Sequence, residues 1–267
     1  LYGDGLDVVF LYVGKLDDAL HATGIGEEAG RVAGEVDELV SYILAKMAET
    51  GVGDSLNFIV SSDHGMAKIT NDKALSLFDY VDESQVDLVI ADGGSVFQVL
   101  PVEGALEEVY SKLKSAHPSM NVFKKEDFPA RFHYANNPRN LPILGYMDVG
   151  WTLYKKVNQS TIPYITAGHG YDNEDMTMKT SFYAQGPSFR KGYRAKHFES
   201  VNIYPLMCEI LGIVPAPNNG SRDNYKDMLI SEHPPTPAPT CGVSALSHHF
   251  QVVLEGFAFS LLFNKII

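Results

Sequence analysis

Residues 6–13 read LDVVFLYV, a continuous apolar run rich in β-branched and aromatic side chains. Such a run predicts a strand buried on both faces, as in parallel sheets. Between Glu27 and Glu49 apolar residues recur with the period of an amphipathic helix, and residues 56–61 (LNFIVS) are typical of a second buried strand. Strand, helix and strand in this order predict an α/β fold, with a mostly parallel sheet flanked by helices.

The rest of the chain offers shorter elements. Residues 127–140, rich in Pro, Asn and Arg, predict an irregular excursion. Residues 234–240 (PPTPAPT) predict a stiff, extended linker, and the apolar stretch 250–267 is short for a membrane span of about 20 residues. That stretch is either a degenerate anchor or a terminal strand. We predict further strands over 86–90, 95–100, 120–124, 142–147, 151–154 and 180–185, and helices over 103–116 and 201–211.

The composition narrows the classes of function. The 267 residues carry a formal net charge of −12, which argues against binding to a nucleic-acid polymer. Small phosphate substrates stay open, because bound metal ions reverse the local field. Two cysteines do not make a disulfide scaffold. Asn158 and Asn219 each begin an Asn-x-Ser triplet, a glycosylation acceptor if the chain is exported.

Metal-ligand side chains follow the predicted strands. Asp17 and His21, four residues apart, lie in a predicted loop after the first strand, and Asp63 and His64 follow the second. His169 stands between two glycines. Because sites in such sheets form at the carboxyl ends of the strands, we expect the first two pairs at one edge. Taken singly, each cluster has an ordinary alternative as a solvated loop or a turn histidine, but together they predict a metal site.

Longer motifs extend these clusters. They are VSSDHGM at 60–66, HGYDN at 169–173, FYAQGPSF at 182–189 and YPLMC at 204–208. With these motifs the chain resembles the ectonucleotide pyrophosphatase/phosphodiesterases of the alkaline phosphatase superfamily over most of residues 6–229. Residues 123–134 look most like the fourth and fifth members of that family.

The resemblance implies an alkaline phosphatase-like fold and two zinc ions. Asp17, His21 and His169 would hold one ion, and Asp63 and His64 part of the other. In the family an upstream Thr is the nucleophile of a two-metal mechanism, and this chain has no match to that segment. We therefore expect an N-terminally truncated fold, with residues 1–230 the C-terminal part of the catalytic domain and 231–267 a Pro-rich linker and apolar tail.

The family resemblance also implies a substrate class and a cellular location. We expect a small phosphodiester or nucleotide substrate, and an extracellular or cell-surface protein, with a C-terminal membrane anchor as one option. Two alternatives stay open: a catalytically inert secreted or cell-surface binding domain of the same descent, and hydrolysis of phosphomonoesters. The residues beside the first pair, Lys15, Leu16 and Leu20, depart from the family pattern, although the ligand types are intact.

Overall fold

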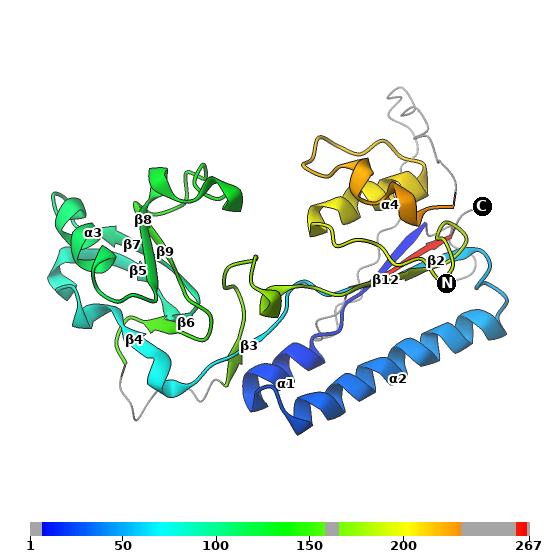
Figure 1. Cartoon of the computed structure of the whole chain (residues 1–267), viewed down its shortest axis with the longest axis horizontal. Helices are drawn as coiled ribbons and strands as arrows, with labels where there is room; N and C mark the ends of the chain where they lie inside the picture. The colour runs from blue at the N-terminus through cyan, green and yellow to red at the C-terminus, as the bar shows by residue number, and fades with distance from the viewer. Residues whose placement is uncertain (1–6, 158–165, 231–259, 266–267) are drawn as a thin grey trace. The chain divides into compact units, whose positions relative to one another are not determined.

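The computed structural model describes residues 7–157, 166–230 and 260–265 (Figure 1). The chain divides into two compact units. Among the described residues, unit 1 holds 7–14, 35–63, 181–230 and 260–265, and unit 2 holds 15–34, 64–157 and 166–180.

In its described residues, unit 1 contains one sheet and two helices. Its elements are β1 (Val8–Leu11), most of α2 (Glu27–Glu49), β2 (Leu56–Ser61), β12 (Phe182–Gln185), α4 (Ile203–Leu211) and β13 (Ser260–Lys265), with 3-10 turns at Ser200–Asn202, Arg222–Asn224 and Lys226–Met228.

The sheet of unit 1 lies between α2 and α4 (Figure 1). Alternation along β2 explains these layers, because successive strand residues face opposite sides. Phe58 packs with the apolar side of α2, including Met47, whereas Ile59 packs with Leu206 of α4. The strand is therefore apolar on both faces, as its sequence predicts, and the α/β fold class is confirmed.

The strand directions correct one expectation. The order in unit 1 is β1-β13-β2-β12, and every neighbouring pair is antiparallel. In the described part of the chain the parallel pairing is that of β10 with β4, so the sheets are not mostly parallel. The physical reason is that β13, distant in sequence, lies between the two strands that α2 connects. Because both are antiparallel to β13, β1 and β2 remain parallel to each other, as expected for a strand–helix–strand unit.

β13 also shows what part of the apolar C-terminal stretch does. Residues 260–265 pair with β1 on one side and β2 on the other, so the alternative of a terminal strand is confirmed for them. Among the described residues, no helix has the length and apolar character needed to cross a membrane. The predicted Pro-rich linker at 234–240 lies outside the described residues.

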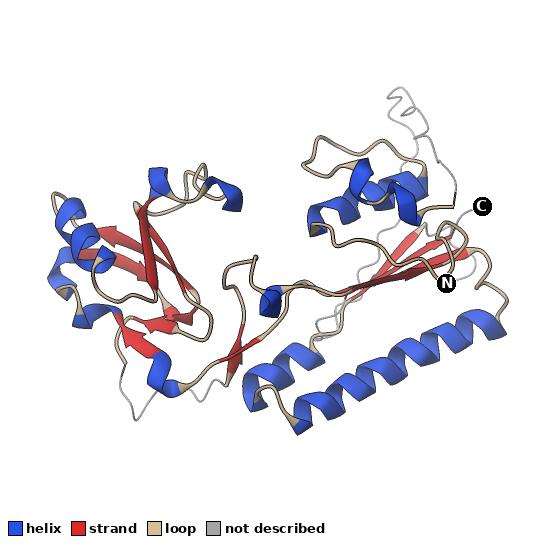
Figure 2. Cartoon of the chain, in the orientation of Figure 1, coloured by secondary structure: helices blue, strands red, loops and turns tan. Residues whose placement is uncertain are grey.

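Unit 2 is built mainly from short strands (Figure 2). Its elements are α1 (Lys15–Thr23), β3 (Ala67–Lys68), β4 (Ala74–Ser76), β5 (Val86–Ile90), β6 (Asp92–Gly94), β7 (Val96–Pro101), α3 (Leu106–Lys114), β8 (Met120–Lys124), β9 (Ile143–Met147), β10 (Thr152–Tyr154) and β11 (Ala167–Gly168), with 3-10 turns at Asn71–Lys73, Leu77–Asp79, Glu83–Gln85, Lys125–Asp127, Ala130–Phe132 and Met176–Met178.

A four-stranded antiparallel sheet, β5-β7-β9-β8, forms the main core of unit 2 with α3. Val109 and Leu113 of α3 are fully buried together with Phe97 and Val99 of β7. The strands predicted over 86–90 and 120–124 are confirmed with the same ends, and the other predicted strands and the helix of unit 2 are found with shifted ends. The predicted excursion at 127–140 is confirmed as irregular, with one 3-10 turn inside it.

Candidate metal site

The first pair of predicted ligands lies on a helix. Asp17 and His21 were expected in a loop, and the structure corrects this, because α1 runs from Lys15 to Thr23. Acidic residues in its first turn suit the positive end of the helix dipole, and a spacing of four residues places both side chains on one face. His21 Nε2 lies 3.5 Å from Asp17 Oδ1.

A short strand pairing brings two further histidines together. β3 follows His64 and is antiparallel to β11, which ends next to His169. The imidazole rings of His64 and His169 stack with their centroids 3.5 Å apart. Each of these two rings places its Nε2 atom 3.9 Å from Asp17 Oδ1. Three histidines from separate parts of unit 2 therefore surround one carboxylate oxygen.

This cluster has the geometry of a cation site. One ligand atom each from Asp17, His21 and His169 lies within 4.8 Å of the others. All three residues are partly buried. A carboxylate and two imidazoles form a donor set used by catalytic zinc sites, which leave one position open for substrate or water. The structure brings these three residues together, and their binding of a metal ion stays a prediction.

Two details of the side chains fit a cation. Among the described residues, Asp17 Oδ1 is a buried oxygen without a hydrogen-bond donor, a costly arrangement unless a cation compensates it. Nδ1 of His21 lies 3.0 Å from the Ala167 carbonyl oxygen, and Nδ1 of His64 lies 2.9 Å from that of Gly65. Because a carbonyl oxygen only accepts, these Nδ1 atoms carry the hydrogen, and both Nε2 atoms keep a lone pair for an ion.

Gly65 is required by close packing of the backbone. In the structure its amide donates to the Met178 carbonyl at 3.1 Å, and a Cβ atom added to it would lie 2.0 Å from the Thr177 carbonyl oxygen. Because Gly65 has no side chain, the Thr177 carbonyl can pack directly against its backbone.

Two hydrogen bonds hold the loop at 168–173, which carries His169. Ser95 Oγ donates to the His169 carbonyl oxygen at 2.8 Å. Tyr171 is buried and its hydroxyl donates to the Trp151 carbonyl oxygen at 3.0 Å. Burial raises the pKa of the Tyr171 hydroxyl to about 12, so this donor keeps its proton across the neutral range.

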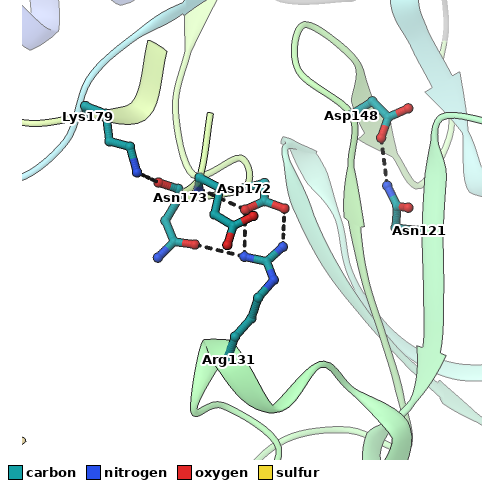
Figure 3. A network of polar contacts seen from close by, with 7 residues as sticks. Asn121, Arg131, Asp148, Asp172, Asn173 and Lys179 are labelled. Atoms are coloured by element: carbon teal, nitrogen blue, oxygen red, sulfur yellow. Dashed lines mark hydrogen bonds and ion pairs between the residues drawn. The ribbon is translucent and has the colours of Figure 1, made fainter. Parts of the chain in front are cut away.

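Arg131, which no sequence motif marks, binds the end of the same loop. Arg131 donates to both carboxylate oxygens of Asp172 and to Asn173 Oδ1, as Figure 3 shows. The hydrogen bond from Arg131 lowers the pKa of the Asp172 carboxyl below its ordinary value. Arg131 and Asp172 are 41 residues apart, so no local spacing marks the contact in the sequence.

Asp63, Asn158 and Asn219 are the remaining predicted site residues. Asp63 ends the segment of unit 1 that precedes His64, and its share in a second ion stays a prediction. Asn219 lies on an exposed loop, where a glycan has room, and Asn158 lies outside the described residues. His64 was assigned to the second ion, yet its ring stacks on the ring of His169. The division of ligands between two ions therefore stays a prediction.

The fold and this cluster define an α/β protein with a candidate metal site. Comparison with known families is consistent with that class. Residues 4–172, which include every predicted ligand, match the family described as type I phosphodiesterase / nucleotide pyrophosphatase. The chain belongs to this family, as its motifs indicate.

Curated relatives carry the same family name. The chain is 39% identical over 259 residues to "Ectonucleotide pyrophosphatase/phosphodiesterase family member 7" of Mus musculus, covering 95% of this chain and 56% of the relative. It is 40% identical over 206 residues to a "Bis(5'-adenosyl)-triphosphatase" of Mus musculus, covering 77% and 44%. The chain thus spans about half the length of the curated relatives that it matches. These matches do not single out the fourth and fifth members.

Solved structures of family member 5 share the fold. The human protein superposes with a TM-score of 0.75 at 36% identity, covering 80% of this chain and 56% of the other. An inactive form of the murine protein in complex with AMP gives a TM-score of 0.75 at 34% identity, with the same coverage. At these identities the likeness extends beyond fold class to the family.

Proposed function

We propose that this chain supplies the metal-binding part of a zinc-dependent phosphodiesterase or nucleotide pyrophosphatase. The observation that carries the proposal is the buried Asp17 oxygen without a donor, surrounded by the Nε2 atoms of His21, His64 and His169. A bound zinc ion supplies a Lewis acid that lowers the pKa of a coordinated hydroxyl or water and offsets charge on a phosphate oxygen.

The residues of the chain then have distinct tasks. Asp17, His21 and His169 hold one ion, and Asp63 and His64 contribute to a second. The carbonyl oxygens of Ala167 and Gly65 orient the imidazoles of His21 and His64, so that both rings offer Nε2. The family resemblance implies a Thr as the nucleophile, and no residue of this chain is proposed for that role.

The substrate is a small phosphodiester or pyrophosphate, and nucleotides are the class favoured by the relatives. One relative is named a bis(5'-adenosyl)-triphosphatase, and a member 5 structure holds AMP. We also propose that the protein is extracellular, since the matched names contain "ectonucleotide" and Asn219 begins an Asn-x-Ser triplet on an exposed loop.

Metal binding is tested on the chain itself. We expect purified chain to retain zinc through dialysis, measured by mass spectrometry of the metal and by competition with a chromophoric chelator. Asp17→Asn should weaken zinc binding by roughly ten-fold or more, because it removes a charged ligand. Asp18→Asn is the matched control, since Asp18 is the exposed neighbour on the same helical turn. Equal zinc affinity of Asp17→Asn and parent would contradict the site.

Hydrolysis is tested on a completed protein. The N-terminal segment of the mouse member 7 relative is joined to this chain, and hydrolysis of a chromogenic nucleotide phosphodiester is measured with zinc present. We expect activity that is lost in His169→Ala. If the joined protein folds and binds zinc but hydrolyses no phosphodiester or pyrophosphate, the enzymatic proposal fails and the inert binding domain is favoured.

A further inference from the structure

Arg131 makes a forked contact with the loop that carries His169. Its two terminal nitrogens donate to the two oxygens of the Asp172 carboxylate, one of them at 2.8 Å, and Asn173 Oδ1 accepts a third bond at 3.2 Å (Figure 3). Asp172 is the third residue after His169. A planar guanidinium that bonds both oxygens of a carboxylate fixes orientation as well as distance.

Arg131 packs against a cluster of aromatic side chains. Its guanidinium lies 4.0 Å from the centre of the Phe132 ring. Phe132 and Tyr134 both contact Phe128, at centroid distances of 5.4 and 5.9 Å. His133, between them, adopts a left-handed conformation with φ of 51°, which reverses the chain so that both aromatic neighbours reach the same ring. Arg131 therefore contacts both this aromatic cluster and Asp172.

The loop side of the contact is also ordered. Asp172 Oδ1 accepts the Glu174 amide at 3.0 Å, and Lys179 Nζ donates to the Asn173 carbonyl oxygen at 2.5 Å. These bonds shape the turn locally, whereas Arg131 connects it to the excursion at 127–140. Exposed ion pairs contribute little to global stability, so the effect of this one is expected to be local.

We propose that Arg131 is a positioning residue of the metal site. By holding Asp172 and Asn173 it limits the loop to one conformation, and so fixes the direction in which His169 presents Nε2. Partners that orient ligands typically change metal affinity ten-fold to a hundred-fold when removed. The proposal deepens the proposed function and rests on it, because it assigns a new residue to the same site.

The first test measures zinc affinity of the intact chain by competition with a chelator. We expect Arg131→Ala to bind zinc roughly ten-fold more weakly or worse, and Arg131→Lys to be intermediate, because an ammonium keeps the charge but not the fork. Arg31→Ala is the matched control. Arg31 also donates two bonds to one carboxylate, that of Glu28 at 2.9 and 2.5 Å, on an exposed helix surface. It should bind zinc as the parent does.

The second test needs no metal. Hydrogen exchange of the peptide covering 168–175 is compared in metal-free parent, Arg131→Ala and Arg31→Ala. We expect faster exchange in Arg131→Ala alone. Unchanged exchange and unchanged zinc affinity in Arg131→Ala would overturn the proposal, as would equal losses in Arg31→Ala. If the parent binds no zinc, the proposed function fails, and the exchange measurement alone decides whether Arg131 fixes the loop.

Discussion

The residues of this site differ in how well the sequence predicts their positions. The spacing of Asp17 and His21 predicts one shared face only if the segment is helical, and α1 provides that helix. The neighbourhood of His64 and His169 depends on the pairing of β3 with β11, and no local pattern shows it. The contact of Arg131 with Asp172 depends on an irregular excursion, so the sequence predicts the candidate ligands but not this contact.

Gly65 offers a test at the same scale. We expect Gly65→Ala to destabilise the chain by roughly 1–3 kcal/mol, because the added Cβ would collide with the backbone carbonyl of Thr177 in the 3-10 turn at Met176–Met178. Zinc affinity should fall as well, since His64 is the adjacent residue. Chemical denaturation and chelator competition measure the two effects. Gly34→Ala is the control, since a Cβ there meets no atom within 4 Å. Parental stability of Gly65→Ala would show that the Thr177 segment moves aside freely.

Tyr171 gives a pH dependence with a definite sign. Its pKa is about 12 in the folded protein because of burial, against about 10 for an unfolded chain. Between these values the unfolded state loses its proton first, so folding stability falls as pH rises, by at most about 1.4 kcal/mol per pH unit. Below pH 10 the full contribution is present.

The matching variant is Tyr171→Phe. At pH 8 it should cost about 1 kcal/mol, because the Trp151 carbonyl loses its donor. The difference from the parent should shrink at pH 11, since phenylalanine does not ionise. Urea denaturation of both proteins at pH 8, 10 and 11 measures this. A stability difference that stays constant with pH would show that the hydroxyl titrates alike in both states.

At the scale of elements, the sequence predicts what is local and periodic. The helix at 27–49 and the strand at 56–61 are found with the predicted bounds, because each repeats one pattern over its whole length. α1 is only nine residues long, and the sequence predicts a loop in its place. The antiparallel sheet order was not predicted either, because β13 joins it from the other end of the chain and pairing through the backbone leaves little trace in side-chain patterns.

β13 can be tested by one substitution. Leu262 lies in register with Phe10 of β1 and Ile59 of β2, in the middle of the sheet. Proline at this position lacks the amide hydrogen that a central strand must donate. We expect Leu262→Pro to lower the free energy of unfolding by roughly 1–3 kcal/mol, the cost of an unpaired acceptor, measured by urea denaturation. An unchanged midpoint would mean that β13 does not pair in solution.

At the scale of the molecule, the ligand cluster belongs to one unit. Asp17, His21, His64 and His169 all lie in unit 2, whereas Asp63 lies in unit 1. Zinc at one hundred times its dissociation constant should therefore stabilise the fold of unit 2 by about 2.7 kcal/mol. Thermal unfolding with zinc and after chelation measures this gain. Asp17→Asn should show little of it, and an equal gain in that variant would place the bound ion elsewhere.

The distance along the chain between α1 and His169 has a mechanical consequence. An ion shared by His21 and His169 would close a loop of about 150 residues in the folded chain. Unlike a disulfide, the ion is released when the chain unfolds, so it stabilises the fold only through its binding free energy. The folded protein would thus have a reversible cross-link that needs no cysteine. Its resistance to proteases should then follow the supply of free metal in its surroundings.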